Sequence, residues 1–263
     1  MREFVRIVVL TLLLFLTSVG GAEAEWKVAT SERESAPNES VEHWRTVAEN
    51  DETSERVTLH FAIFERRRAT LRVIDQAGTP RQDLAEVMTQ RHCLAGVNGG
   101  YFDPSDAPVG LLVSDGHLIA PLQKARLLSG VLVATAAQVD IVRAARFSRS
   151  ERIKAAVQCG PFLVERAQPV PRLNDSRLAR RTFAAVDGEG RGALGVCSDI
   201  SLAQFSKILC LTKVAGEMKI VRALNLDGGS SSAFWFAVKE SAFSIPEQKT
   251  VRDFVAIVPR PDR

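Results

Sequence analysis

The chain has 263 residues, of which 46% are hydrophobic and 25% are charged, so its composition is that of a globular protein rather than of a collagen-like or disordered chain. The formal net charge is only +3 and 6% of the residues are aromatic, which argues against nucleic acid as the main partner. The length permits one large domain or two small ones.

The first 24 residues are organised like a signal peptide. Arg2 and Arg6 give a basic start, residues 7–16 form an apolar run, and Ala22 and Ala24 are the small residues that signal peptidase requires. As a helix, the run would reach only about 15 Å, against roughly 30 Å of bilayer hydrocarbon. Cleavage after Ala24 is therefore favoured over an uncleaved anchor, and we expect a periplasmic or secreted protein with no stable membrane span.

The four cysteines all lie in the expected mature part of the chain. An even number in an exported protein permits two disulfides in three pairings, with buried free thiols as the alternative. Because Cys93 and Cys159 both lie near glycine turns, we expect a bridge between them and a second bridge between Cys197 and Cys210. No CxxC or zinc-finger spacing occurs, so neither a metal nor a cofactor is expected.

Residues 25–40 are largely polar and predict a mobile lead-in, which leaves residues 41–263 as the folded domain. Apolar and alternating runs predict short strands at 41–47, 57–64, 69–74, 93–97, 109–113, 117–120, 127–134, 139–142, 153–157, 183–186, 193–196, 220–226, 233–238 and 254–258. Helical spacing of apolar residues predicts helices over 83–91 and 201–211, the second capped by Ser198 or Asp199.

The order of these elements decides the fold class. Asp115-Gly116, between two apolar runs, predicts a hairpin. Strands and helices do not alternate regularly, which argues against a doubly wound parallel sheet. We therefore predict an α+β single domain with a mainly antiparallel or mixed β-sheet and a few short helices. The basic run at residues 66–68 is interpreted as a solvated turn rather than as an anion site.

Three turns follow apolar strands and combine glycine with groups that bind polar ligands. The first turn, residues 98–103, has paired glycines after Asn98 and ends at Asp103. The second turn, residues 158–161, contains Gly160 before a proline. The third turn, residues 225–231, has Asp227 followed by two glycines and hydroxyl side chains. Glycine lets the backbone approach a ligand closely, and a carboxylate beside such a turn suits acid–base chemistry.

The order Asn-Gly-Gly-Tyr-Phe, Gly-Pro, Arg-Thr and Asn-Leu-Asp-Gly-Gly-Ser-Ser resembles the phosphodiester glycosidase family over roughly residues 57–258. The resemblance implies hydrolysis of a sugar-1-phosphodiester in glycans or envelope polysaccharide, with carbohydrate or sugar phosphate as the partner. Ser230 stands where the best-known members have a third glycine, so the substrate itself stays open.

The resemblance also implies roles for particular residues. Asp227 would be the base or nucleophile, Asp103 a second carboxylate, and Arg181 a bidentate phosphate clamp. Calcium held by the two aspartates is the alternative to a site without metal. The expected substrate-binding residues are Asn98, Gly99, Gly100, Tyr101, Gly160, Thr182, Gly228, Gly229, Ser230 and Ser231.

Two other functions compete with this interpretation. A non-catalytic carbohydrate-binding or envelope-assembly protein on the same fold would lack a second acid near Asp227. A serine hydrolase using Ser230 or Ser231 is disfavoured, because the chain has no G-x-S-x-G motif and none of its four histidines lies in a catalytic motif.

Overall fold

Antiparallel strand pairing builds the fold in the computed structural model, which describes residues 25–34, 40–238 and 241–260. The expected signal peptide, residues 1–24, lies outside the described residues. Within the described ranges, no helix is both long and apolar enough to cross a bilayer.

The elements follow one another in this order: β1 (Trp26–Glu34), β2 (Val41–Asn50), β3 (Arg56–Glu65), β4 (Ala69–Asp75), α1 (Leu84–Gln90), β5 (Ala95–Asn98), β6 (Leu112–Ser114), β7 (His117–Ala120), β8 (Gly130–Thr135), β9 (Val139–Arg143), η1 (Ala144–Arg146), β10 (Ile153–Cys159), β11 (Phe162–Glu165), β12 (Gln168–Pro169), β13 (Ala179–Val186), β14 (Arg191–Ile200), α2 (Leu202–Ile208), β15 (Arg222–Asn225), η2 (Gly229–Ser231), β16 (Phe234–Phe236), β17 (Phe243–Ile245) and β18 (Asp253–Pro259). The two η elements are short 3-10 helices.

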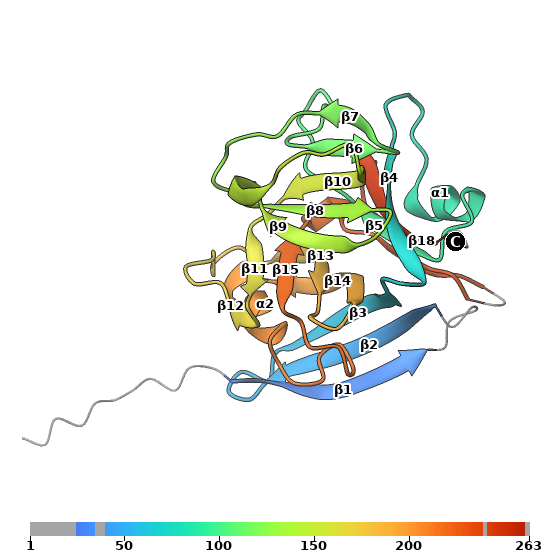
Figure 1. Ribbon diagram of the computed structural model, residues 1–263. Helices are drawn as coiled ribbons and strands as arrows, with labels where there is room; N and C mark the ends of the chain where they lie inside the picture. The colour runs from blue at the N-terminus through green and yellow to red at the C-terminus, as the bar shows by residue number, and fades with distance from the viewer. Residues whose placement is uncertain (1–24, 35–39, 239–240, 261–263) are drawn as a thin grey trace, which may run out of the picture.

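The strands form three sheets, and every pairing between named strands is antiparallel, which confirms the predicted fold class. An eight-stranded sheet has the order β1-β2-β3-β14-β13-β15-β11-β12, and two five-stranded sheets have the orders β7-β6-β10-β8-β9 and β17-β16-β5-β18-β4. Figure 1 shows the β7–β9 sheet at the top and the β1–β3 end of the large sheet at the bottom.

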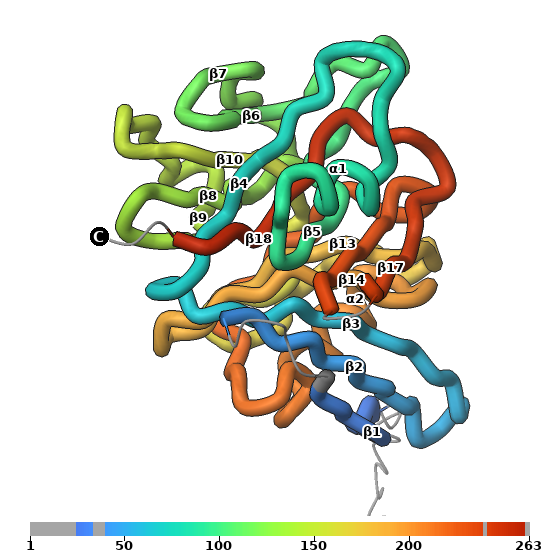
Figure 2. Tube along the Cα trace, turned by 90° about the vertical axis from the view of Figure 1, so that its right-hand side faces the viewer, coloured from blue at the N-terminus to red at the C-terminus, as the bar shows by residue number. Residues whose placement is uncertain are grey.

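The main core lies where the three sheets face one another. Alternate residues of the strands fill it, such as Leu71 and Val73 of β4, Val157 of β10 and Ala184 of β13. The other face of the large sheet packs against α2 through Phe205 and neighbouring apolar side chains. The short helix α1 lies beside β5 in Figure 2 and buries its apolar stripe in a third cluster.

Local signals in the sequence account for several elements. Asp115 and Gly116 have φ values of 47° and 85°, as the predicted β6–β7 hairpin turn requires. Asp83 caps α1 by accepting a hydrogen bond from the Glu86 N–H at 2.7 Å. The cap of α2 is Ser201, whose hydroxyl accepts from the Gln204 N–H at 3.1 Å, because the two candidates named from the sequence, Ser198 and Asp199, still belong to β14.

The structure corrects two further expectations. Much of the predicted mobile lead-in is the edge strand β1, which pairs with β2 and is anchored by the buried Trp26. The expected disulfides are not formed: all four cysteines are free thiols, and all but the half-buried Cys210 are buried. Burial raises the pKa of the Cys93 thiol to about 11, so it stays protonated at neutral pH.

Candidate active site

The three glycine turns of the sequence meet in the structure. The first turn follows β5, the second follows β10, and the third follows β15. The Asp227 N–H donates to the Gly99 carbonyl at 3.1 Å, which joins the third turn to the first. The Asn225 N–H donates to the Pro161 carbonyl at 3.0 Å, which joins the third turn to the second.

Asn98 is the side chain that holds the first and third turns together. It is 1% exposed, and its Nδ2 donates to the Asp227 carbonyl at 2.7 Å. Its Oδ1 accepts from the Thr182 hydroxyl at 2.7 Å and from the Ala233 N–H at 3.1 Å. A buried amide with both ends bonded fixes the turns to β13, so the position of Asp227 is set by several elements at once.

Tyr101 forms the matching link to the second turn. Its hydroxyl donates to the Gly160 carbonyl at 2.6 Å and accepts from Asn225 Nδ2 at 3.1 Å. Burial raises the pKa of the phenol far above its usual value, so the group acts here as a hydrogen-bonding strut and not as a proton donor to substrate.

Two of the glycines are required by geometry. A Cβ on Gly99 would lie 1.9 Å from Oδ1 of Asp253, so no larger residue fits there. Gly229 has a φ of 63°, a region that glycine occupies without strain, and it begins the 3-10 turn over Gly229–Ser231.

Asp227 is half-buried at the start of the third turn. Burial raises the pKa of its carboxyl, while the Ser231 hydroxyl, the Gly228 N–H, which donates to Oδ1 at 2.9 Å, and the positive charges of Lys249 and Arg177 act in the opposite direction. The carboxyl is half-buried rather than enclosed, which suits a base or nucleophile.

Asp253 is a second carboxyl beside the first turn, and the sequence reasoning missed it. It is 1% exposed, its Oδ1 accepts from the Gly100 N–H at 3.0 Å, and its carbonyl accepts from the Gly99 N–H at 2.9 Å. Burial raises its pKa to about 7, and the negative charges of Asp75 and Asp227 add to the rise. An acid at the start of the last apolar strand was the signal available in the sequence.

Asn225 Oδ1 and Asp253 Oδ2 are buried polar atoms of this cluster without a hydrogen-bond partner among the described residues. Unsatisfied buried polar atoms are rare in native proteins, so these two support the choice of the cluster as the candidate site. Ser230, in contrast, is exposed, and its carbonyl accepts from the Gln248 N–H at 2.8 Å.

Asp103 does not have the environment of a catalytic acid. Its Oδ1 accepts from the Ser105 hydroxyl at 2.7 Å, the Ser105 N–H at 2.8 Å and the Ala107 N–H at 2.9 Å. The Ser105 hydroxyl is the main cause of the lowered pKa of this carboxyl. Asp103 therefore organises its own loop as an ionised acceptor, which differs from the role expected from the sequence.

Arg181 is also placed differently from expectation. It is 7% exposed, and its Nε and Nη2 donate to the carbonyls of Ile200 at 2.8 Å and Arg177 at 2.6 Å. Two of the guanidinium donors are thus bonded to backbone carbonyls, and we propose that Arg181 braces the protein rather than clamping phosphate. The cations whose charges reach Asp227 are the exposed Arg177 and Lys249, and Lys249 Nζ lies 5.0 Å from the Phe102 ring centre in the first turn.

A cavity of about 340 Å³ adjoins the third turn through Arg180. Arg180 lines it together with His60 and Asp199, and Arg180 Nη2 donates to the Ser232 carbonyl. Burial lowers the pKa of His60 to about 4, so its imidazole is neutral at physiological pH. Among the described residues, no group of three His, Cys, Asp or Glu side chains is placed to hold a metal ion.

Similar proteins share the segment that carries these turns. A family model described as phosphodiester glycosidase matches residues 91–258, which include the three turns and Asp253. The Escherichia coli K12 protein YigE, itself uncharacterized, is 27% identical over 164 residues, which are 60% of this chain and 64% of that protein. The chain thus spans less than two thirds of the length of this relative.

Solved structures show the same fold. The catalytic domain of zebrafish N-acetylglucosamine-1-phosphodiester alpha-N-acetylglucosaminidase, auto-inhibited by its pro-peptide, has a TM-score of 0.62 and 17% identity, covering 87% of this chain and 88% of that one. A putative exported protein from Burkholderia pseudomallei has a TM-score of 0.59 and 15% identity, covering 79% and 75%. The family match over residues 91–258, well over half of the sequence, shows that this chain belongs to the phosphodiester glycosidase family.

Proposed function

We propose that this protein is an exported hydrolase that cleaves the bond between a sugar's anomeric carbon and phosphate in a sugar-1-phosphodiester of glycans or envelope polysaccharide. The observation that carries the proposal is the convergence of the three turns: Asn98 joins the first turn to the third and holds the half-buried Asp227 beside two glycines, and Tyr101 links the second turn. Family membership supports the reaction class, and the zebrafish relative is named for a reaction of this kind.

In this proposal Asp227 acts at the anomeric carbon, as a base toward water or as a nucleophile. The oxygen of water ends bonded to the anomeric carbon, and the phosphate leaves with the electron pair of the broken bond. A phosphate monoester is a stable anion, so neutralising its charge matters more than protonating it. Arg177 and Lys249 are the cations for that task, because their charges already reach Asp227.

Asp253 is assigned as a positioning residue rather than a catalytic one. Its buried carboxyl holds the Gly100 N–H, and in the protonated form it adds no charge near Asp227. The 340 Å³ cavity beside Arg180 is assigned to the sugar, because its mainly apolar wall carries the polar side chains of Arg180, His60 and Asp199.

The test is an activity screen of the chain from residue 25 onward against sugar-1-phosphodiesters that differ in sugar and in anomeric configuration. We expect turnover of at least one substrate, and we expect Asp227→Asn to abolish it while leaving binding largely intact, because the amide keeps the shape and loses the charge. Binding without turnover in the parent protein would instead favour the non-catalytic carbohydrate-binding alternative. Full activity of Asp227→Asn would refute the assignment of Asp227.

A further inference from the structure

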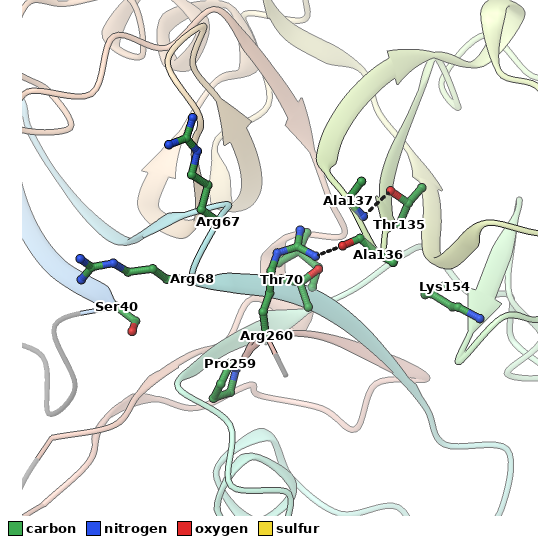
Figure 3. A pocket seen from close by; sticks show the side chains of 11 residues that line it. Ser40, Arg67, Arg68, Thr70, Thr135, Ala136, Ala137, Lys154, Pro259 and Arg260 are labelled. Carbon is green, nitrogen blue, oxygen red and sulfur yellow. Dashed lines mark hydrogen bonds between the residues drawn. The ribbon is translucent and has the colours of Figure 1, made fainter. Parts of the chain in front are cut away.

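A second cleft lies at the opposite end of β4 and β18 from the glycine turns. Its volume is about 920 Å³. Figure 3 shows the side chains that line it. In the register of these strands Ala69 pairs with Pro259 at the cleft end and Asp75 with Asp253 at the turn end, so the two places are about 20 Å apart along the strands. The cleft is therefore separate from the proposed active site.

Four cations line this cleft: Arg67 and Arg68 from the turn between β3 and β4, Lys154 from β10, and Arg260 just after β18. The other described lining residues are Ser40, Thr70, Leu71, Thr135, Ala136, Ala137 and Pro259, so neither a carboxylate nor an aromatic ring is among them. Arg68 has an ion pair with Glu65 at 3.3 Å, but both side chains are more than half exposed, and such a pair is weak. The wall is consequently strongly cationic.

The arrangement of the cations suits an extended anion. Arg260 is held in place because its Nε donates to the Arg66 carbonyl at 2.7 Å and its Nη1 donates to the Ala136 carbonyl. Figure 3 shows Arg260 between Arg67 and Arg68 on one side and Lys154 on the other. Charges spread along a cleft of this size match several anionic groups in a row better than one isolated phosphate.

We propose that this cleft binds a glycan chain that carries phosphodiester groups. Guanidinium groups pair with phosphate oxygens, and the Thr70 hydroxyl can meet sugar hydroxyls. Single-stranded nucleic acid fits less well, because its binding sites rely on aromatic rings on which bases stack. The choice of phosphate as the anion rests on the proposed function, whereas the cationic cleft itself does not.

The experiment compares two triple variants with the same change of charge. Arg67→Gln, Arg68→Gln and Lys154→Gln together remove three exposed cations of the cleft, while Arg260 is kept because it braces two loops. The control removes three exposed cations that do not line the cleft, by Arg91→Gln, Arg149→Gln and Lys213→Gln. Both sets are made in the Asp227→Asn background, so that binding is measured without turnover.

Binding of an oligosaccharide with phosphodiester-linked sugars is measured by calorimetry at two salt concentrations. We expect the cleft variant to bind about tenfold more weakly than its parent with a smaller salt dependence, since each exposed charge contact is worth a factor of a few, and the control to stay within twofold. Equal losses in both variants, or no loss in the cleft variant, would overturn the proposal. It is likewise overturned if single-stranded DNA with the same number of phosphates binds as tightly as the glycan.

A second measurement separates this proposal from the proposed function. With Asp227 intact, the cleft variant should cleave a small sugar-1-phosphodiester as fast as the parent protein and lose efficiency only on the polymer, through a higher KM. If neither protein cleaves the small substrate while the cleft variant still loses glycan affinity, the proposed hydrolysis fails and the cleft proposal stands. Unchanged KM for the polymer would contradict the cleft proposal even where hydrolysis is confirmed.

Discussion

Asp227 and Asp253 flank the first turn, and burial raises the pKa of both carboxyls. They differ in exposure: Asp227 is half-buried, whereas Asp253 is 1% exposed and has one carboxyl oxygen without a hydrogen-bond partner among the described residues. The proposed function therefore assigns the two carboxyls different roles, one chemical and one that holds a turn, on the basis of their environments.

The raised pKa of Asp253 makes stability depend on pH. The pKa is about 7 in the folded protein, against the ordinary value of 3.8, so between these values the folded state holds a proton that the unfolded state has lost. The free energy of unfolding should therefore fall, through this group, as pH rises from about 4 to about 7, by an amount on the order of a few kcal/mol.

Asp253→Asn removes this titration, so we expect a flatter stability profile and a gain of stability at pH 7. Urea unfolding at several pH values measures the effect. The control is Asp115→Asn, which removes an exposed carboxylate from a hairpin turn. Parallel profiles for the parent protein and Asp253→Asn would show that Asp253 does not carry the proton.

Substitutions at Arg177 and Arg181 should have different effects: the first should lower activity, and the second should lower thermal stability. Arg177→Gln removes an exposed cation whose charge acts on Asp227, so kcat/KM for a phosphodiester should fall by about 10²-fold with little change in Tm.

Arg181→Lys loses the fork that bonds two carbonyls, so Tm should fall by an amount that corresponds to roughly 1–3 kcal/mol. Arg146→Gln, at an exposed site elsewhere, is the control. A large activity loss at unchanged Tm in Arg181→Lys would restore Arg181 as the clamp.

At the scale of single elements, sequence patterns predicted correctly those helices and turns whose structure depends mainly on neighbouring residues. The spacing of Leu84, Val87 and Met88 predicted α1, and Asp115-Gly116 predicted the β6–β7 hairpin. The polar sequence of β1 was misinterpreted, because an edge strand is held by backbone pairing with β2 and buries few side chains beyond Trp26. Its exposed charges, such as Lys27 and Arg33, also suit an edge that must not pair with another chain.

The candidate site was predictable only in part, for a related reason. The three turns were visible as local motifs, and their order resembled a known family. Asp253 and Lys249 were missed because strand register and loop packing bring them to the first turn from more than 140 residues away. The hydrogen bonds of Arg181 could not be predicted, because a sequence does not show which guanidinium donors are bonded to backbone carbonyls.

Because the first turn is closely packed at Gly99, we expect that it does not tolerate an added side-chain atom at this position. A Cβ at Gly99 would collide with Asp253 Oδ1, so Gly99→Ala should destabilise the protein by about 1–3 kcal/mol and abolish turnover through displacement of the turn. Gly78→Ala is the control, since nothing lies within 4 Å of its added Cβ. Thermal unfolding and an activity assay measure both effects, and normal behaviour of Gly99→Ala would contradict the described contact.

At the scale of the whole molecule, the proposed export gives a prediction about the N-terminus. The leader pattern of residues 1–24 ends at Ala24. Mass spectrometry of protein expressed in a bacterial host should therefore find a new N-terminus near Glu25 in the periplasmic or secreted fraction. Recovery of intact Met1 in the membrane pellet would contradict cleavage.

The pairing of β4 with β18 also has a kinetic consequence. Ala69 pairs with Pro259, so the sheet that carries the first turn closes only after nearly the whole chain is available. Contacts so distant in sequence slow folding, because a long loop must lose its freedom before any pairing energy is gained. Nascent chains that end before residue 253 lack both the closing strand and the carboxyl that holds Gly100. The proposed activity should therefore emerge only after residues 253–259 have been made, and a nascent chain that ends earlier should be inactive.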